Sequence, residues 1–133
     1  PATVEQAAPA VATLETDGRA AGAALRTIYS NYKKDGKFDT SNLNNIISTI
    51  SLINSCKSLK ENGKDKAYWS DFASGLVLGS ENLIKQEISG TVTNKLAEMV
   101  EKVDTEKVES TVEKAAAVKT VASDMVSLLS LFK

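Results

Sequence analysis

The most suggestive chemistry in the sequence lies in residues 31–42, NYKKDGKFDTSN, between two segments of helical periodicity. Asn31, Asp35, Asp39 and Asn42 offer carboxylate and amide oxygens, which are the ligands that calcium prefers in proteins. A glycine among them allows a sharp turn, because glycine adopts a positive φ without steric cost. The stretch is therefore a candidate metal-binding loop or a turn between helices.

The spacing resembles the second half of an EF-hand calcium loop. With Gly36 at the sixth of twelve loop positions, Asp35 and Asp39 take positions five and nine. Lys33, however, brings an ammonium group to position three, and Asn42 stands where the bidentate glutamate is needed. Because a lysine competes for the ligand space, two carboxylates do not compensate the dehydration of the ion, and we expect a capped turn. A degenerate, calcium-responsive helix–loop–helix protein is the alternative.

The composition removes most of the usual catalytic and metal-binding chemistry. The 133 residues include no histidine, which is the commonest general base and transition-metal ligand. The single cysteine, Cys56, excludes an intramolecular disulfide and a cysteine-cluster metal site, and we expect it to be an inert thiol. No nucleophile elbow, Ser-x-x-Lys motif or phosphate loop occurs. We predict no enzymatic activity, no catalytic residue, no cofactor and no metal site.

Carboxylates alone remain as a catalytic alternative. The segment 95–114 mixes acidic and basic side chains, and Glu98 and Lys102 have the spacing of a helical ion pair. Such a mixed run is typical of a solvated helix face. A small hydrolase or transferase would instead need two acidic side chains in one cleft with raised pKa values.

Small and aromatic residues mark the segment 66–90. Gly75 and Gly79 have the spacing G-x-x-x-G, which predicts a close helix crossing inside the protein, with a dimer seam as the alternative. An aromatic group could line a pocket for an apolar or sugar-like ligand, although core packing is its commoner role. The aromatic group comprises Tyr68, Trp69 and Phe72 of this segment, together with Tyr29 and Tyr32, which lie earlier in the chain.

Apolar residues recur at steps of three and four along the chain, which is the period of an amphipathic helix, and no strand pattern survives. Helices are predicted over residues 18–34, 43–62, 66–89 and 91–132, the last being one helix or two. The predicted fold class is all-α, an antiparallel bundle of four or five helices. Residues 1–15 are interpreted as a flexible Ala-rich N-terminal arm, and residues 16–133 as a single helical-bundle domain.

The pattern also predicts buried faces and helix starts. Leu43, Ile46, Ile47, Ile50 and Ile53 trace one inner stripe, with Asn and Ser between them. Predicted cap residues are Asp39, Thr40 or Ser41 for the second helix, Asp65 or Ser70 for the third, and Asp104 for a late break.

The charges are balanced, with 16 Lys and Arg against 17 Asp and Glu, so no basic excess indicates a nucleic-acid partner. No apolar run approaches the ~20 residues that a membrane span needs. The stretches DGKFDTSNLNNI and DFASGLVLGSENLI resemble small exported helical proteins of gut-type Bacteroidetes that carry no assigned activity. The resemblance covers residues 30–85 and implies a periplasmic or cell-surface setting, with a lipid anchor outside the printed chain.

We therefore expect a non-catalytic exported helical domain that acts by binding or as an accessory of a cell-envelope assembly. Its partner would be a protein or an apolar small molecule, and a homodimer is a further expectation. Neither nucleic acid nor a membrane span is expected.

Overall fold

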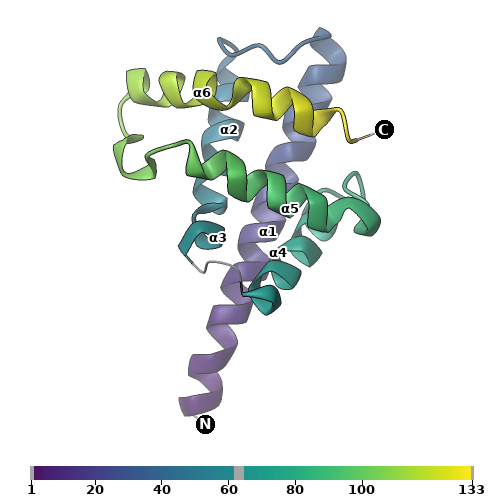
Figure 1. Cartoon of the computed structure of the whole chain (residues 1–133), viewed down its shortest axis with the longest axis vertical. Coiled ribbons are helices and arrows are strands. Elements are labelled where there is room, and N and C mark those ends of the chain that lie inside the picture. The colour runs from purple at the N-terminus through teal and green to yellow at the C-terminus, as the bar shows by residue number, and fades with distance from the viewer. Residues whose placement is uncertain (1, 62–64, 133) are drawn as a thin grey trace.

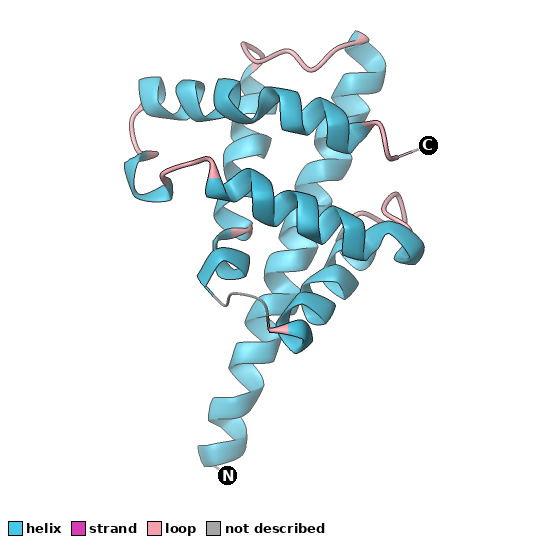
Figure 2. Ribbon diagram, in the orientation of Figure 1, coloured by secondary structure: helices cyan, strands magenta, loops and turns pink. Residues whose placement is uncertain are grey.

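The computed structural model describes residues 2–61 and 65–132, with side chains described from Glu15 onward except at Lys66. All regular structure in this part of the chain is helical (Figure 2). The predicted all-α class with four or five main helices is confirmed. The elements are α1 (Ala2–Asp35), α2 (Leu43–Ser55), α3 (Lys57–Glu61), α4 (Lys66–Gly79), α5 (Gln86–Glu101), the 3-10 turn η1 (Thr105–Lys107) and α6 (Thr111–Leu129).

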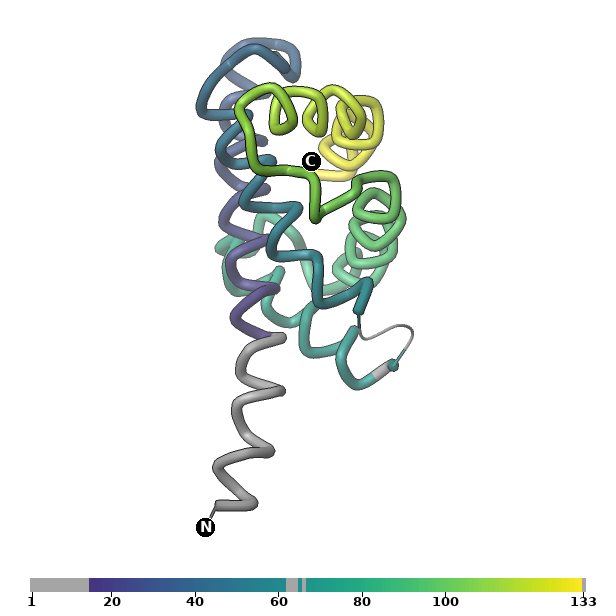
Figure 3. The backbone as a smooth tube through the Cα atoms, turned by 90° about the vertical axis from the view of Figure 1, so that its left-hand side faces the viewer, coloured from purple at the N-terminus to yellow at the C-terminus, as the bar shows by residue number. Residues whose placement is uncertain are grey.

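The helices form two layers that cross each other steeply. Figure 1 shows α1, α2 and α4 in one layer, with α5 and α6 lying antiparallel to each other across them. The view in Figure 3, turned by a quarter, shows α5 and α6 nearly end-on beside the long axis of α1. Since α1 packs against both α2 and α4, it is the central element of its layer.

The core lies between the two layers and draws on every main helix. Its largest side chains are almost completely removed from solvent, and each aliphatic or aromatic side chain buried in this way contributes about 1.5–3 kcal/mol of transfer free energy. They are Leu25, Ile28, Leu52, Ile53, Leu59, Phe72, Leu76, Ile84, Leu96, Met99 and Phe132.

Helices α1 and α4 cross with their backbones in contact. A Cβ atom added at Gly22 would lie 2.6 Å from the carbonyl oxygen of Leu76, and one added at Gly75 would lie 2.8 Å from the amide nitrogen of Arg19. Gly79 is equally tight, since a Cβ there would overlap the carbonyl group of Arg19. The prediction of a close crossing at Gly75 and Gly79 is confirmed. Because α1 covers this face, it cannot also be the seam of a dimer.

The predicted single helix over residues 66–89 is wrong, because the chain breaks between Gly79 and Gln86. Glu81 and Asn82 have φ values of 53° and 66°, which no α-helix accommodates. Neither proline nor glycine occurs within the break, so the sequence pattern did not show it. Gly90, predicted to end this helix, instead lies inside α5.

Two details of the second predicted helix also differ. It ends at Ser55, and α3 follows after Cys56, while the predicted stop at residues 62–63 lies outside the described residues. Leu43 and Ile47, predicted to face the core, are 68% and 58% exposed. Asn45 and Thr49 are buried in their place, and Asn45 accepts a hydrogen bond from Asn31 of α1.

The cap predictions are partly confirmed. Asp65 caps α4 by accepting from the amide of Ala67, as predicted. Asn42 rather than Asp39, Thr40 or Ser41 caps α2, and Asp104 caps only the 3-10 turn. Residues 91–132 contain two helices, since a second helix, α6, begins at Thr111 after the N-cap residue Ser110, whose capping box is completed by Glu113.

The first helix starts at Ala2 rather than at Gly18. The division into an arm over residues 1–15 and a bundle over residues 16–133 stays a prediction, because the side chains of residues 1–14 lie outside the described part.

Candidate functional site

Two of the candidate ligand residues in the segment 31–42, Asp39 and Asn42, use their side-chain oxygens in local hydrogen bonds. The Asp39 carboxylate accepts from the Ser41 amide at 2.9 Å and from the Ser41 hydroxyl at 2.7 Å, which holds the pKa of Asp39 below its ordinary value. The side-chain oxygen of Asn42 accepts from the Asn45 amide at 3.0 Å. Gly36 takes a φ of 73° at the end of α1. These contacts form a capped turn.

Asn45 ties this turn to α1. Its buried amide nitrogen donates to the Asp39 carbonyl at 3.0 Å, and its side-chain oxygen accepts from Asn31 at 3.2 Å. Buried amides that satisfy each other in this way fix one relative position of the two helices. Throughout the described residues, no group of three or more histidine, cysteine or acidic side chains is arranged to hold a metal ion.

Two carboxylates of α6, those of Asp124 and Glu113, are used in structural contacts. Lys102 pairs with Asp124 at 2.8 Å, joining α5 to α6, rather than with Glu98 one turn away. Glu113 accepts from the backbone and hydroxyl of Ser110, which lowers the pKa of Glu113. Both contacts position helices.

Two titratable groups with raised pKa values lie where α1 meets the segment around α3. Partial burial raises the pKa of Asp17, a hydrogen bond from Ser58 opposes this shift, and the charge of Glu61 adds to it. Complete burial raises the pKa of the Cys56 thiol, and the charge of Asp17 contributes. Cys56 is therefore protonated at neutral pH, and a protonated thiol is a poor nucleophile.

The structure places the predicted aromatic group at two separate ends of the molecule. Trp69 and Tyr68 are partly buried at the start of α4, and Phe72 belongs to the core. Tyr29 instead packs edge-on against Phe132, with ring centroids 5.8 Å apart. The antiparallel crossing explains the separation, since Gly22 of α1 already lies beside the last turn of α4.

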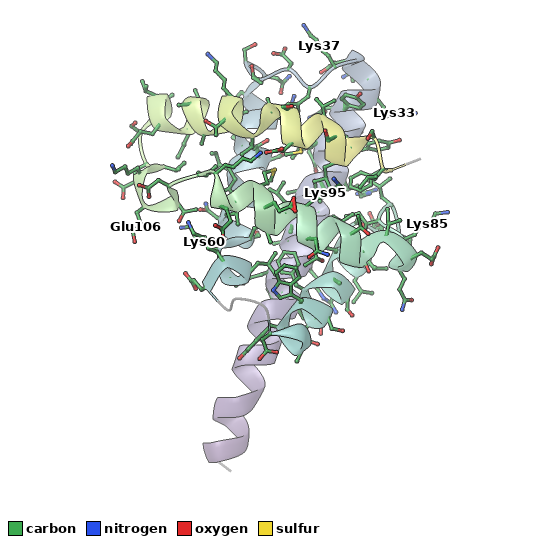
Figure 4. All side chains as sticks on the ribbon, in the orientation of Figure 1. Lys33, Lys37, Lys60, Lys85, Lys95 and Glu106 are labelled. Carbon is green, nitrogen blue, oxygen red and sulfur yellow. The ribbon has the colours of Figure 1, made fainter. Side chains whose placement is uncertain are left out.

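An open groove of about 690 Å³ lies between the C-terminal half of α1 and the turn that joins α4 to α5. We call it the α1–turn groove. Figure 4 shows Lys33 at the upper end of α1 and Lys85 just beyond the turn, on the same side of the molecule. The lining residues are Arg26, Thr27, Tyr29, Ser30, Asn31 and Lys33 from α1, and Ser80, Glu81, Asn82 and Leu83 from the turn.

The charges of the groove are two cations and one anion. Arg26 Nη1 lies 2.7 Å from Glu81 Oε2, but both side chains are more than half exposed, so the pair is weak. Lys33 Nζ lies 5.8 Å from the ring centroid of Tyr29, within cation–π range. The lining therefore combines a net positive charge with one aromatic ring.

The rim of the groove is held in a strained conformation. Glu81 and Asn82 are consecutive non-glycine residues in the left-handed region, a conformation that costs about 1–2 kcal/mol per residue. The turn is locked on both sides, since the Asn82 amide donates to the Val77 carbonyl and the Ile84 amide donates to the Ser80 hydroxyl, each at 3.0 Å. Strained backbone of this kind concentrates at ligand-binding sites.

The sequence pattern did not single out Arg26, Glu81 or Asn82. The available signal was the pair Glu81–Asn82 directly after Gly79, because Asn tolerates the left-handed region better than other non-glycine residues.

Two other hollows are smaller. One of about 440 Å³ between α4 and α5 has no charged lining residue, and its walls are Ser70, Ala73, Ser74, Val77, Leu78, Gln86 and Ser89. One of about 160 Å³ between α5 and α6 includes the Lys102–Asp124 pair and Lys95.

Comparison with protein-family models, with curated proteins and with solved structures finds no match. Of the helices in the described residues, none combines the length and apolar character that crossing a bilayer requires.

Proposed function

We propose that this chain is a non-catalytic binding domain and that the α1–turn groove is its ligand site. The ligand we propose is a small organic anion, with a carboxylate or phosphate group beside a flat, partly apolar part. The observation that carries the proposal is the strained, locked turn at Glu81–Asn82 on the rim of a 690 Å³ groove.

The lining supports an anion rather than a cation. Among the described residues the acidic partner of Arg26 is Glu81, and their contact is exposed; because an arginine has five N–H donors, a ligand carboxylate has donors to bind. Lys33 supplies a second positive charge over the face of Tyr29. The exposed part of the Tyr29 ring provides a surface for the flat part of the ligand.

The size of the groove supports a small molecule. Ligand pockets commonly enclose about 300–1,000 Å³, so 690 Å³ suits a compound of a few fused or linked rings. A single-ring probe should bind weakly, because the binding free energy scales with the number of ligand atoms.

Amide NMR titration with benzoate, benzamide and benzylamine tests the proposal. The three probes share a ring and differ in charge. We expect benzoate to shift the amides of residues 26–33 and 80–83 with a Kd of about 1–10 mM, and the other two to bind at least about fivefold more weakly. Equal shifts for all three probes, or shifts confined to other helices, would contradict it.

The two arginines of the chain give a matched pair of variants. Arg26→Gln removes the groove cation and should weaken benzoate binding, whereas Arg19→Gln removes an arginine that pairs with Glu15 on the same helix. Glu81→Gln removes the internal competitor for Arg26 and should strengthen binding. If Arg19→Gln and Arg26→Gln weaken binding equally, a general charge effect explains the result and the groove does not.

We further propose an exported setting at the cell envelope, in which the domain serves as an accessory. The support is the likeness of residues 30–85 to small exported helical proteins. Immunodetection in periplasmic, membrane and cytoplasmic fractions of the native cell tests it, and a cytoplasmic signal would overturn it.

A further inference from the structure

The outward side of α2 has no charge. The segment 40–56 contains no acidic or basic residue, although 25% of the whole chain is charged. Leu43 and Ile47, one helical turn apart on this side, are 68% and 58% exposed. Figure 3 shows the molecule from the side along which α2 runs. We name this surface the outer α2 face, and it comprises the exposed residues Leu43, Asn44, Ile47, Ser51 and Asn54.

We propose that the outer α2 face is the contact surface between two copies of this chain, packed antiparallel across a two-fold axis. The proposal does not depend on the α1–turn groove, which lies on other elements. A two-fold contact lays the same surface against itself, so each charge on it would be buried unpaired unless an opposite charge stood at the symmetry-related position that it faces. The outer α2 face avoids such unpaired burial because it has no charge. Depletion of charge is also what distinguishes the centre of an interface from ordinary surface.

The distribution of side-chain size supports the antiparallel arrangement. The first half of the outer α2 face carries the large aliphatic side chains Leu43 and Ile47, and the second half carries Ser51 and Asn54. With the axis midway between Ile47 and Ser51, each isoleucine packs over the serine of the other copy. Large side chains of one helix then fill the spaces above small ones of the other, as close helix packing requires.

The polar residues are complementary in the same register. Asn44 of one copy then faces Asn54 of the other, and two amide side chains can each donate and accept a hydrogen bond. A parallel arrangement would instead oppose the aliphatic pair to itself and leave the serine facing a serine. The antiparallel register therefore satisfies the apolar and the amide groups together.

The size of the surface sets the strength of the contact. A helix of 13 residues is about 20 Å long, and one face of it is smaller than the ~800 Å² per partner of a standard interface. The dimer should therefore be weak, with a Kd of about 0.1–1 mM, and visible only in concentrated samples.

Sedimentation equilibrium over about 10 µM to 1 mM protein tests the proposal. The wild-type chain should rise from the monomer mass toward twice that mass. Ile47→Lys and Ser51→Glu should each stay monomeric, because each places a charge in the apolar centre. An equimolar mixture of these two variants should associate again, since the ammonium group introduced in one copy then faces the carboxylate introduced in the other across the axis.

Val112→Lys is the matched control, because Val112 is a 79% exposed aliphatic residue that belongs to α6 and is not part of the outer α2 face. It should associate as the wild type does. Circular dichroism checks that all variants keep their helix content. Four outcomes overturn the proposal: a wild-type chain monomeric up to 1 mM, an Ile47→Lys variant that still associates, an equal loss in Val112→Lys, or a mixture that stays monomeric.

Discussion

Gly79 and Gly90 form a matched pair for testing the crossing of α1 and α4. A Cβ at Gly79 would overlap the backbone of Arg19, whereas one at Gly90 would have no neighbour within 4 Å. Gly79→Ala should therefore lower the free energy of unfolding by about 2–3 kcal/mol, since two backbones must move apart. Gly90→Ala should raise it by about 0.5–1 kcal/mol, because alanine is the better helix former. Urea unfolding of both variants measures the difference, and similar values for the two would show that the crossing is looser than described.

Asp17 is a single residue that should make the free energy of unfolding depend on pH. The pKa of Asp17 in the folded state is raised above its ordinary value of 3.8, chiefly by burial. The folded state therefore binds this proton more tightly than the unfolded state does. The contribution of Asp17 to the free energy of unfolding is therefore full below pH 3.8, and it is lost as the pH rises through the folded-state pKa. Asp17→Asn removes this loss, so the stability difference between variant and wild type should grow as the pH rises above 3.8 and level off above the folded-state pKa of Asp17. Thermal melts across this range measure it, and a difference that stays constant with pH would contradict the partial burial of Asp17.

Single residues also show how far sequence reasoning reaches. The burial of Ile50 and Ile53 on α2, and the capping of α4 by Asp65, follow from local pattern, and the structure confirms them. The exposure of Leu43 could not be predicted, because the buried side of α2 instead includes Asn45, whose hydrogen-bond partner Asn31 comes from another helix. The groove was missed for the same reason, since its two walls come from segments that are distant in sequence.

The turn between α4 and α5 is the element whose conformation determines the groove. Asn82 has a φ of 66°, which a β-branched residue adopts only at high cost. Asn82→Val should lower the free energy of unfolding by about 1–2 kcal/mol, and Asn82→Gly should leave it unchanged or raise it slightly. Asn94→Val, at an exposed position inside α5, controls for the change of side chain. Equal losses at positions 82 and 94 in urea unfolding would mean that the left-handed conformation is not the cause.

At the scale of the whole molecule, the two layers should unfold together because the C-terminus packs across both. Phe132 follows α6, is 1% exposed and contacts the ring of Tyr29 on α1. Phe132→Ala should lower the free energy of unfolding by about 3–4 kcal/mol, whereas Val126→Ala, at a 41% exposed position on α6, should cost under about 1 kcal/mol. Trp69 lies in α4, far along the chain from Phe132, so its fluorescence reports whether the loss spreads to the other layer. In urea, the fluorescence and far-ultraviolet circular dichroism midpoints of Phe132→Ala should fall together. A dichroism transition that precedes an unchanged Trp69 transition would instead show that α5 and α6 unfold as a separate unit.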